Sequence, residues 1–199
     1  MNEQKTGCHE ARHALPRLAR LESALQDSGK KSLPPVELWN PPYCGDIGMA
    51  IARDGSWYYQ GSRINRIALV KLFSTVLRRD DDGRHYLVTP VEKVDVAVED
   101  APFLGVEMEM IAGEGDYAGE QVLVVRTNLD DVVRVGAEHT IRFETQVDGG
   151  FKPYVHVRGG LEALFTRALA YDLAELLVND DQDRTGIWSG GRFFAVAGT

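Results

Sequence analysis

Two arginines that follow a Gly-Ser pair are the residues of this sequence with the clearest chemical potential. Ser62 is placed to cap a helix predicted over residues 64–77, which puts Arg63 and Arg66 at its start. The backbone dipole is already positive there, so two cations are unfavourable unless an anion meets them. Free backbone N–H groups at a helix start also bind phosphate or carboxylate. The pattern predicts a small-anion site formed by Ser62, Arg63 and Arg66.

Other side chains could complete this site or compete for it. Asp46 and Glu92 could pair with the arginines, which would make them ordinary surface ion pairs. The segment 89–93, "TPVEK", lies at a predicted domain boundary, where clefts commonly form, although a strand entry with solvated charges is the alternative. Aromatic side chains could stack on a planar ligand or belong to the core. The remaining predicted ligand-binding residues are Trp39, Tyr43, Asp46, Thr89, Glu92 and Lys93.

Nucleophilic and metal chemistry have weaker support in the sequence. Cys44 has no histidine near it in the chain, so we interpret it as a buried structural thiol, with a nucleophile as the alternative. Asp46 follows Gly45 and can cap a turn, orient an arginine or act in acid-base catalysis. The run 179–190 resembles a calcium loop but has Gly190 where a bidentate glutamate is required. We therefore expect no catalytic residue, no metal and no cofactor.

Composition limits the partners of the chain. The 199 residues are 44% hydrophobic, which suits one large or two small globular domains. The formal net charge of −8 repels polyanions, so nucleic acid is not an expected partner. Only two cysteines are present, and no apolar run approaches the roughly 20 residues that cross a bilayer. We expect a soluble cytoplasmic protein with no membrane partner.

The first half of the chain must position the predicted anion site. Leucines at helical spacing within residues 10–31 predict an amphipathic helix that ends at Gly29, and four prolines predict an extended connector over residues 31–46. Alternating apolar residues on both sides of Asp54-Gly55 predict a β-hairpin. The helix over residues 64–77 then follows, with a broad apolar face that should pack on the hairpin.

The same order of elements is predicted again near the C-terminus. Strands surround Asp148-Gly149, and a glycine pair precedes a helix predicted over residues 161–177. Aligning the two helices by their apolar positions pairs Ile64, Ile67, Ala68 and Leu72 with Leu161, Leu164, Phe165 and Leu169. We interpret this as an internal duplication of a hairpin–helix motif.

Short alternating runs separate the two copies and predict a β-rich second half. From Val91 onward the pattern indicates about six strands followed by a helix, which suits a curled antiparallel sheet or small barrel closed by that helix. The predicted fold is α+β in two small domains, with residues 1–90 forming an N-terminal helix plus hairpin–helix domain. Residues 91–199 form the antiparallel β domain.

Three linked motifs of this chain resemble one bacterial protein family. They are "ELWNPPYCGDIGMAIARDGSWYYQGSRINRIALVKLFSTVL", "DGRHYLVTPVEKV" and "VEDAPFLGVEM". They are similar to domain of unknown function family 1285 over roughly residues 36 to 178. The resemblance implies a two-part α+β fold with a repeated motif and a C-terminal part like a pleckstrin-homology domain. It departs at Gly48, where the family pattern usually has aspartate, which puts any role of that position in doubt.

The resemblance also implies a function, though no established reaction. It implies a ligand site at the domain interface, for a nucleotide-like molecule in bacterial signalling. Together with the predicted anion site, this favours a small-ligand-binding sensor or adaptor that takes an anionic, nucleotide-like ligand and works with a signalling protein. Two alternatives stay open: an enzyme that uses Cys44 or Asp46, and a module that binds a protein or peptide at a sheet edge.

Overall fold

The computed structural model describes residues 33–146 and 150–196 and divides into two compact units. The first unit runs to Glu99 and the second begins at Asp100, whereas the sequence predicted a boundary near Pro90. That prediction is wrong because the strand that follows Pro90 pairs inside the first sheet. The helix predicted within residues 10–31 and the turn at Asp148-Gly149 lie outside the described residues.

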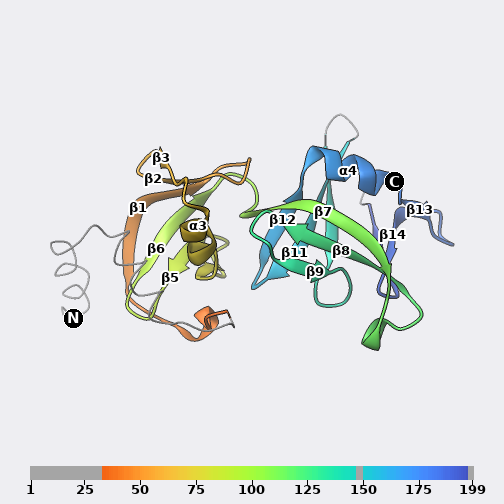
Figure 1. The fold of residues 1–199 in the computed structure, drawn as a ribbon, viewed down its shortest axis with the longest axis horizontal. Helices are drawn as coiled ribbons and strands as arrows, with labels where there is room; N and C mark the ends of the chain where they lie inside the picture. The colour runs from red at the N-terminus through yellow and green to blue at the C-terminus, as the bar shows by residue number, and fades with distance from the viewer. Residues whose placement is uncertain (1–32, 147–149, 197–199) are drawn as a thin grey trace. The chain divides into compact units, whose positions relative to one another are not determined.

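The first unit is built on one six-stranded sheet with the strand order β3-β2-β1-β6-β5-β4 (Figure 1). Strands β1 and β6 are parallel, and every other neighbouring pair in this sheet is antiparallel. The elements of this unit are η1 (Val36–Leu38), β1 (Tyr43–Ile51), β2 (Trp57–Tyr59), β3 (Ser62–Arg63), α3 (Ile67–Ser74), β4 (Leu77–Arg79), β5 (His85–Val88) and β6 (Lys93–Val98).

The predicted hairpin at Asp54-Gly55 is present between β1 and β2. Met49 pairs with Tyr59 and Ile51 with Trp57, so the alternating apolar residues of both strands enter one core. Gly55 has a φ of +76°, a left-handed conformation that glycine adopts without strain. The hairpin turn was therefore correctly predicted from the Asp-Gly pair.

The helix that follows begins later than predicted. Gln60 and Gly61 both have positive φ, +48° and +77°, and form a two-residue turn of the kind that joins hairpin strands. Ser62 and Arg63 consequently fold back as β3, where they pair with Tyr59 and Tyr58. The N-cap of α3 is Arg66, and it makes no side-chain capping bond. The prediction that Ser62 caps the helix and that Arg63 lies in its first turn is wrong, whereas Arg66 does lie at the helix start.

The second unit has its own six-stranded sheet, in the order β10-β11-β12-β7-β8-β9, and a three-stranded sheet, β13-β14-β15. Strands β12 and β7 are parallel, while the other neighbours of the larger sheet are antiparallel. Its elements are β7 (Phe103–Ala112), η2 (Gly115–Tyr117), β8 (Gln121–Thr127), β9 (Val132–Arg134), β10 (Ile141–Thr145), β11 (Phe151–Arg158), β12 (Leu161–Phe165), α4 (Arg167–Ala174), β13 (Val178–Asn179), β14 (Thr185–Ser189) and β15 (Arg192–Ala195).

The second predicted helix also begins later, at Arg167. Gly159 and Gly160 both have positive φ and turn the chain back, so residues 161–165 form strand β12. Thr166 then caps α4, because its side chain accepts a hydrogen bond from the backbone N–H of Leu169. The predicted alignment of Leu161, Leu164 and Phe165 with helical positions of the first unit is therefore wrong.

The two units correspond in a different way. Each helix is preceded by a two-residue hairpin turn and followed by a second hairpin, β4–β5 or β13–β14. The tight turns of these second hairpins match: Asp80 N–H donates to the Arg84 carbonyl at 3.1 Å, and Asp180 N–H to the Arg184 carbonyl at 3.0 Å. The units thus share the order hairpin, helix, hairpin.

No helix in the described part of the chain is long and apolar enough to cross a membrane.

Candidate functional site

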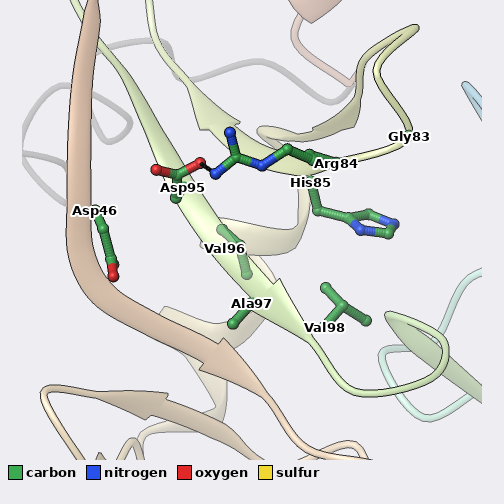
Figure 2. Close-up of a pocket in the computed structure, with 8 residues that line it drawn as sticks. All are labelled: Asp46, Gly83, Arg84, His85, Asp95, Val96, Ala97 and Val98. Carbon is green, nitrogen blue, oxygen red and sulfur yellow. Dashed lines mark hydrogen bonds and ion pairs between the residues drawn. The ribbon is translucent and has the colours of Figure 1, made fainter.

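A pocket of about 410 Å³ opens in the first unit where β1, β5 and β6 meet the turn between β4 and β5 (Figure 2). Its volume is in the range of small-molecule sites. Strand β1 and the turn supply polar groups, and β6 supplies a short apolar strip beside a buried carboxylate. The lining residues are Asp46, Gly83, Arg84, His85, Asp95, Val96, Ala97 and Val98.

Asp46 reaches the pocket because β1 is irregular around it. The register between β1 and β6 shifts on both sides of the pair Asp46–Asp95, and Gly48 has a φ of +77°. The backbone N–H of Gly48 donates to Asp46 Oδ1 at 2.7 Å, which leaves Oδ2 without a partner among the described residues. A Cβ at Gly48 would lie 3.2 Å from the backbone of Gln60, and its positive φ strains residues that carry a side chain, so glycine is favoured here. Gly48 therefore shapes the bulge that presents Asp46.

Asp95 anchors a polar network on the opposite strand. It is largely buried and accepts hydrogen bonds from the Tyr43 hydroxyl and from Arg84 Nη2, the latter at 2.5 Å. The hydrogen bond to Asp95, together with burial, raises the pKa of Tyr43. Arg84 is 59% exposed and its guanidinium also lies 5.5 Å from the centre of the Tyr86 ring. Tyr43 and Arg84 thus satisfy Asp95 from two sides.

His85 forms part of the wall next to this ion pair. Burial lowers its pKa, and the charge of Arg79 lowers it further, so the imidazole is neutral at pH 7. No hydrogen-bond partner for either ring nitrogen is found within residues 33–146 and 150–196. A neutral imidazole carries one donor and one acceptor. His85 can therefore offer both to a ligand.

The lining charges make the pocket slightly acidic. Two carboxylates, Asp46 and Asp95, face one guanidinium, Arg84, and the histidine is neutral. The apolar surface comes from Val96, Ala97 and Val98. In the described part of the chain no group of three or more His, Cys, Asp or Glu residues could hold a metal ion. The arrangement suits hydrogen bonding and ion pairing with a small ligand.

The structure brings some of the predicted residues to this region. Asp46 lines the pocket and Tyr43 holds Asp95. Lys93 pairs with Asp80 at 2.9 Å and lies 4.5 Å from the centre of the Tyr86 ring, so it belongs to the same polar face. The carbonyl of Trp39 accepts a hydrogen bond from the buried Arg78 instead of facing a ligand.

Other predicted residues lie elsewhere. Thr89 is fully buried, and its hydroxyl accepts hydrogen bonds from the backbone N–H groups of Val91 and Glu92, which closes the β5–β6 turn. Glu92 is thereby a turn residue. Ser62, Arg63 and Arg66 do not line the pocket. Arg63 lies on β3 and Arg66 is the N-cap residue of α3, so the two cations do not share a first helical turn as predicted.

Cys44 differs from the predicted buried thiol. Cys44 is half-buried on β1, between Tyr43 and Gly45. No cysteine in the described part of the chain is a free thiol. Cys44 is therefore not presented as a free nucleophile in this structure.

The polar side chains of the lining that the sequence analysis missed are those of Arg84, His85 and Asp95. Asp95 lies in the alternating run "VEKVDVAVE", from which the sequence predicts only a strand. The segment "DDDGRHYL" was read as the end of a helix and the start of a strand. One signal was present, because Asp-Asp-x-x-Arg occurs at residues 80–84 and again at 180–184. Both copies form the same tight turn, which presents the arginine.

Tyr86 is expected to ionise well above the pH at which an ordinary tyrosine does. Its hydroxyl donates to Asp82 Oδ2 at 2.6 Å, and this bond, followed by burial, raises the pKa of Tyr86 to about 12. The neutral phenol is favoured by folding, so its contribution to stability is complete below pH 10 and is lost as the pH rises through about 12. The difference in phenolate absorbance between the wild type and Tyr86→Phe measures this titration. A midpoint near pH 10 would contradict the assignment.

Comparison with known proteins identifies both units. The N-terminal domain of DUF1285, a domain of unknown function, matches residues 34–101, and the C-terminal domain of DUF1285 matches residues 102–196. No curated protein matches the chain. A DUF1285 family crystal structure from Silicibacter pomeroyi DSS-3 is 46% identical, with a TM-score of 0.77, and the match covers 88% of this chain and 93% of that one.

A second crystal structure, of a DUF1285 family protein from Shewanella baltica OS155, is 29% identical with a TM-score of 0.49. That match covers 65% of this chain and 91% of the other. The two family models together span both units without a gap between them. The resemblance of the motifs around Trp39, Arg84 and Phe103 is thus a family relationship, and the chain belongs to the DUF1285 family.

Proposed function

We propose that this protein is a small-ligand-binding sensor or adaptor and that the pocket of the first unit is its ligand site. One observation carries the proposal: a hollow of about 410 Å³ is walled by polar groups that keep unused hydrogen-bonding capacity. Asp46 Oδ2 and both ring nitrogens of His85 have no partner among the described residues. Polar groups arranged in this way can fix the orientation of a bound molecule.

Binding is favoured over catalysis by the same wall. Acyl or phosphoryl transfer needs a nucleophile, a base in contact with it and a group that orients the base. Of the lining residues, Asp95 is engaged by Tyr43 and Arg84, and Asp46 is bonded to backbone. A role in bacterial signal transduction is part of the proposal and follows the family resemblance.

The sequence predicts an anionic, nucleotide-like ligand, and the pocket offers one guanidinium, that of Arg84, to an anionic group. The cation that could meet an anionic group here is Arg84, whose side chain is 59% exposed while one of its nitrogens stays on Asp95. A guanidinium carries five N–H donors, so it can hold Asp95 and a ligand carboxylate or phosphate together. An anionic group is therefore proposed to bind at Arg84, in place of the helix start at Arg66.

Filling the pocket is expected to abolish ligand binding without unfolding the protein. Ala97 is exposed and lines the pocket, so Ala97→Phe places a ring in the hollow. Melting temperatures of the full chain are measured with a library of amino acids, amines, organic acids and nucleotides, because a bound ligand stabilises the folded state. A compound that stabilises the wild type should leave Ala97→Phe unaffected.

The matched control is Ala112→Phe, which changes an exposed alanine at the end of β7 in the second unit. This variant should respond to the compound as the wild type does. If Ala97→Phe keeps the full ligand response, the ligand binds elsewhere and the pocket assignment is wrong. If no compound of any class stabilises the wild type, the proposed function itself is unsupported.

We also propose that the second unit has a pleckstrin-homology-like arrangement in which α4 closes one end of the curled sheet. The support is local: α4 lies against β7 and β12 (Figure 1), and a Cβ added at Gly105 would lie 3.5 Å from Leu169 Cδ2. Glycine at this position lets the helix approach the sheet closely. Superposition of an experimental structure of this unit on pleckstrin-homology domains tests the proposal, and a different strand order would overturn it.

A further inference from the structure

The pocket presents opposite charges within reach of one small molecule. Asp46 and Asp95 are register partners on β1 and β6, and neighbouring strands lie roughly 4.8 Å apart. Arg84 Nη2 is 2.5 Å from Asp95 Oδ1, so the guanidinium is held by the strand residue that pairs in register with Asp46. Figure 2 shows Asp46 coming from β1, and the Arg84–Asp95 pair from the turn and β6.

The two carboxylates differ in how many of their hydrogen-bond acceptor positions are already occupied. Asp95 already accepts hydrogen bonds from Tyr43 and Arg84, which satisfy one oxygen each. Asp46 is exposed, and among the described residues it accepts only the Gly48 backbone N–H, through Oδ1. A cationic or N–H-donating group of a ligand would therefore bind at Asp46, whereas Asp95 holds Arg84 in place for an anionic group.

Between these charged groups the wall is apolar or neutral. Val96, Ala97 and Val98 follow one another along β6, and His85 is kept uncharged by burial and by Arg79. A ligand with several negative charges would meet two carboxylates and one guanidinium, and would be repelled on balance. A simple amine would leave the donors of Arg84 unused, and a simple acid would approach Asp46 unfavourably.

We propose that the pocket binds an α-amino-acid-like zwitterion, with its ammonium group on Asp46, its carboxylate on Arg84 and its side chain against residues 96–98. This inference rests on the proposed function and narrows it to one ligand class. The net charge of such a ligand is zero. It therefore brings a cation for Asp46 and an anion for Arg84 without changing the net charge of the pocket. His85 contributes a donor and an acceptor to whichever polar group lies beside it.

The test measures binding to the full-length protein by isothermal titration calorimetry, with the twenty standard L-amino acids as probes. The strongest binder is then compared with the amine that lacks its carboxylate and the acid that lacks its amino group. Each truncated compound should bind at least about tenfold more weakly, since each loses a hydrogen bond between charged groups. Equal binding of the amine or of the acid would overturn the zwitterion assignment.

Two variants assign the charges to their residues. Asp46→Asn keeps an oxygen for the Gly48 N–H and should bind the amino acid at least about tenfold more weakly, while its affinity for the matched acid does not fall. Arg84→Gln should show the reverse pattern, with the matched amine unaffected. The controls are Asp116→Asn and Arg192→Gln, exposed residues outside the pocket that should bind as the wild type does.

The outcomes separate this inference from the proposed function. If a nucleotide or an amine binds, and Ala97→Phe abolishes that binding, the pocket is a ligand site but the zwitterion assignment is wrong. If an amino acid binds equally to the wild type, Asp46→Asn and Arg84→Gln, the assignment is also wrong. If no compound of any class binds the wild type, both the inference and the proposed function fail.

Discussion

Replacing Phe73 with alanine is expected to lower the free energy of unfolding by about 3–5 kcal/mol, the range found when a buried aromatic side chain is removed. Phe73 is fully buried on α3, and its ring stacks on Trp57 at a centroid distance of 6.5 Å. Trp57 itself is 1% exposed and held in the core, so it cannot easily shift to fill the cavity that Phe73→Ala leaves. Urea denaturation followed by circular dichroism measures the change.

Phe73→Leu is the matched comparison because it keeps most of the apolar volume, and its loss should be clearly smaller. On the same helix, Ala68→Gly changes an exposed residue and should cost only about 1 kcal/mol through helix propensity. If Phe73→Ala loses no more than Ala68→Gly does, α3 is not packed on β2 as described.

Arg78→Met is expected to be comparably destabilising, by about 3–5 kcal/mol, and to release the proline-rich connector from the sheet. The Arg78 side chain is 10% exposed and forms an ion pair of 2.5 Å with Asp80. Its Nη1 donates to the carbonyls of Val36 and Trp39, both at 2.8 Å. The substitution leaves Lys93 as the remaining ion-pair partner of the partly buried Asp80 carboxylate among the described residues. It also removes the donor that the two backbone carbonyls share. Urea denaturation and limited proteolysis within residues 33–42 measure the two effects.

The neighbouring residue supplies the control. Arg79 is exposed and donates to the Gly83 carbonyl at 3.4 Å, so Arg79→Met should change stability by less than about 1 kcal/mol. Proteolysis of the connector should then proceed as in the wild type. Equal sensitivity of the two variants would mean that Arg78 does not hold the connector, and the anchoring role would have to be withdrawn.

Asp80 links these stability effects to pH. Burial by itself would raise its pKa, but the hydrogen bonds and charges of Arg78 and Lys93 outweigh this and lower the pKa of Asp80. A carboxyl group with a lowered pKa in the folded state stabilises the fold above its unfolded value, near 3.8, and this contribution disappears as the pH falls through the folded value. The polar face around the pocket should therefore loosen in acid.

The family comparison gives these predictions a wider reach. A solved DUF1285 structure matches with a TM-score of 0.77 at 46% identity, so the same overall fold is shared by a related protein. The proposed pocket lies wholly within the part of the chain matched by the N-terminal family model, residues 34–101. Binding measurements on the Silicibacter pomeroyi protein can therefore be compared with those proposed for this one.

Local sequence patterns were sufficient for the hairpin at Asp54-Gly55 and for several other strands. Alternation around Asp54-Gly55 predicted β1 and β2, and alternating runs between the two hairpin–helix segments predicted strands β6 to β9. These signals are local because side chains alternate between the two faces of a strand and because Asp-Gly favours the turn. Of the predicted ligand-binding residues, Asp46 lines the pocket and Tyr43 bonds to Asp95 beside it, and their role in binding stays a prediction.

The helix starts were misread for a physical reason that local patterns conceal. Gln60-Gly61 and Gly159-Gly160 are followed by apolar residues at spacings that fit either a helix or a strand. Their positive φ angles form two-residue turns, and β3 and β12 gain hydrogen bonds with strands already in place. Pairing with those strands decides the outcome. Arg63 consequently lies on β3, while Arg66 remains at the helix start as the N-cap residue of α3.

Composition, family membership and the chemistry of individual turns were determined by the sequence itself. The pocket was decided only by tertiary structure, because its walls come from β1, the β4–β5 turn, β5 and β6, and parallel pairing of β1 with β6 places Asp46 beside Asp95. No spacing in the chain encodes that register. The partners of Asp95 likewise come from residues 43 and 84, which long-range pairing alone brings to one carboxylate.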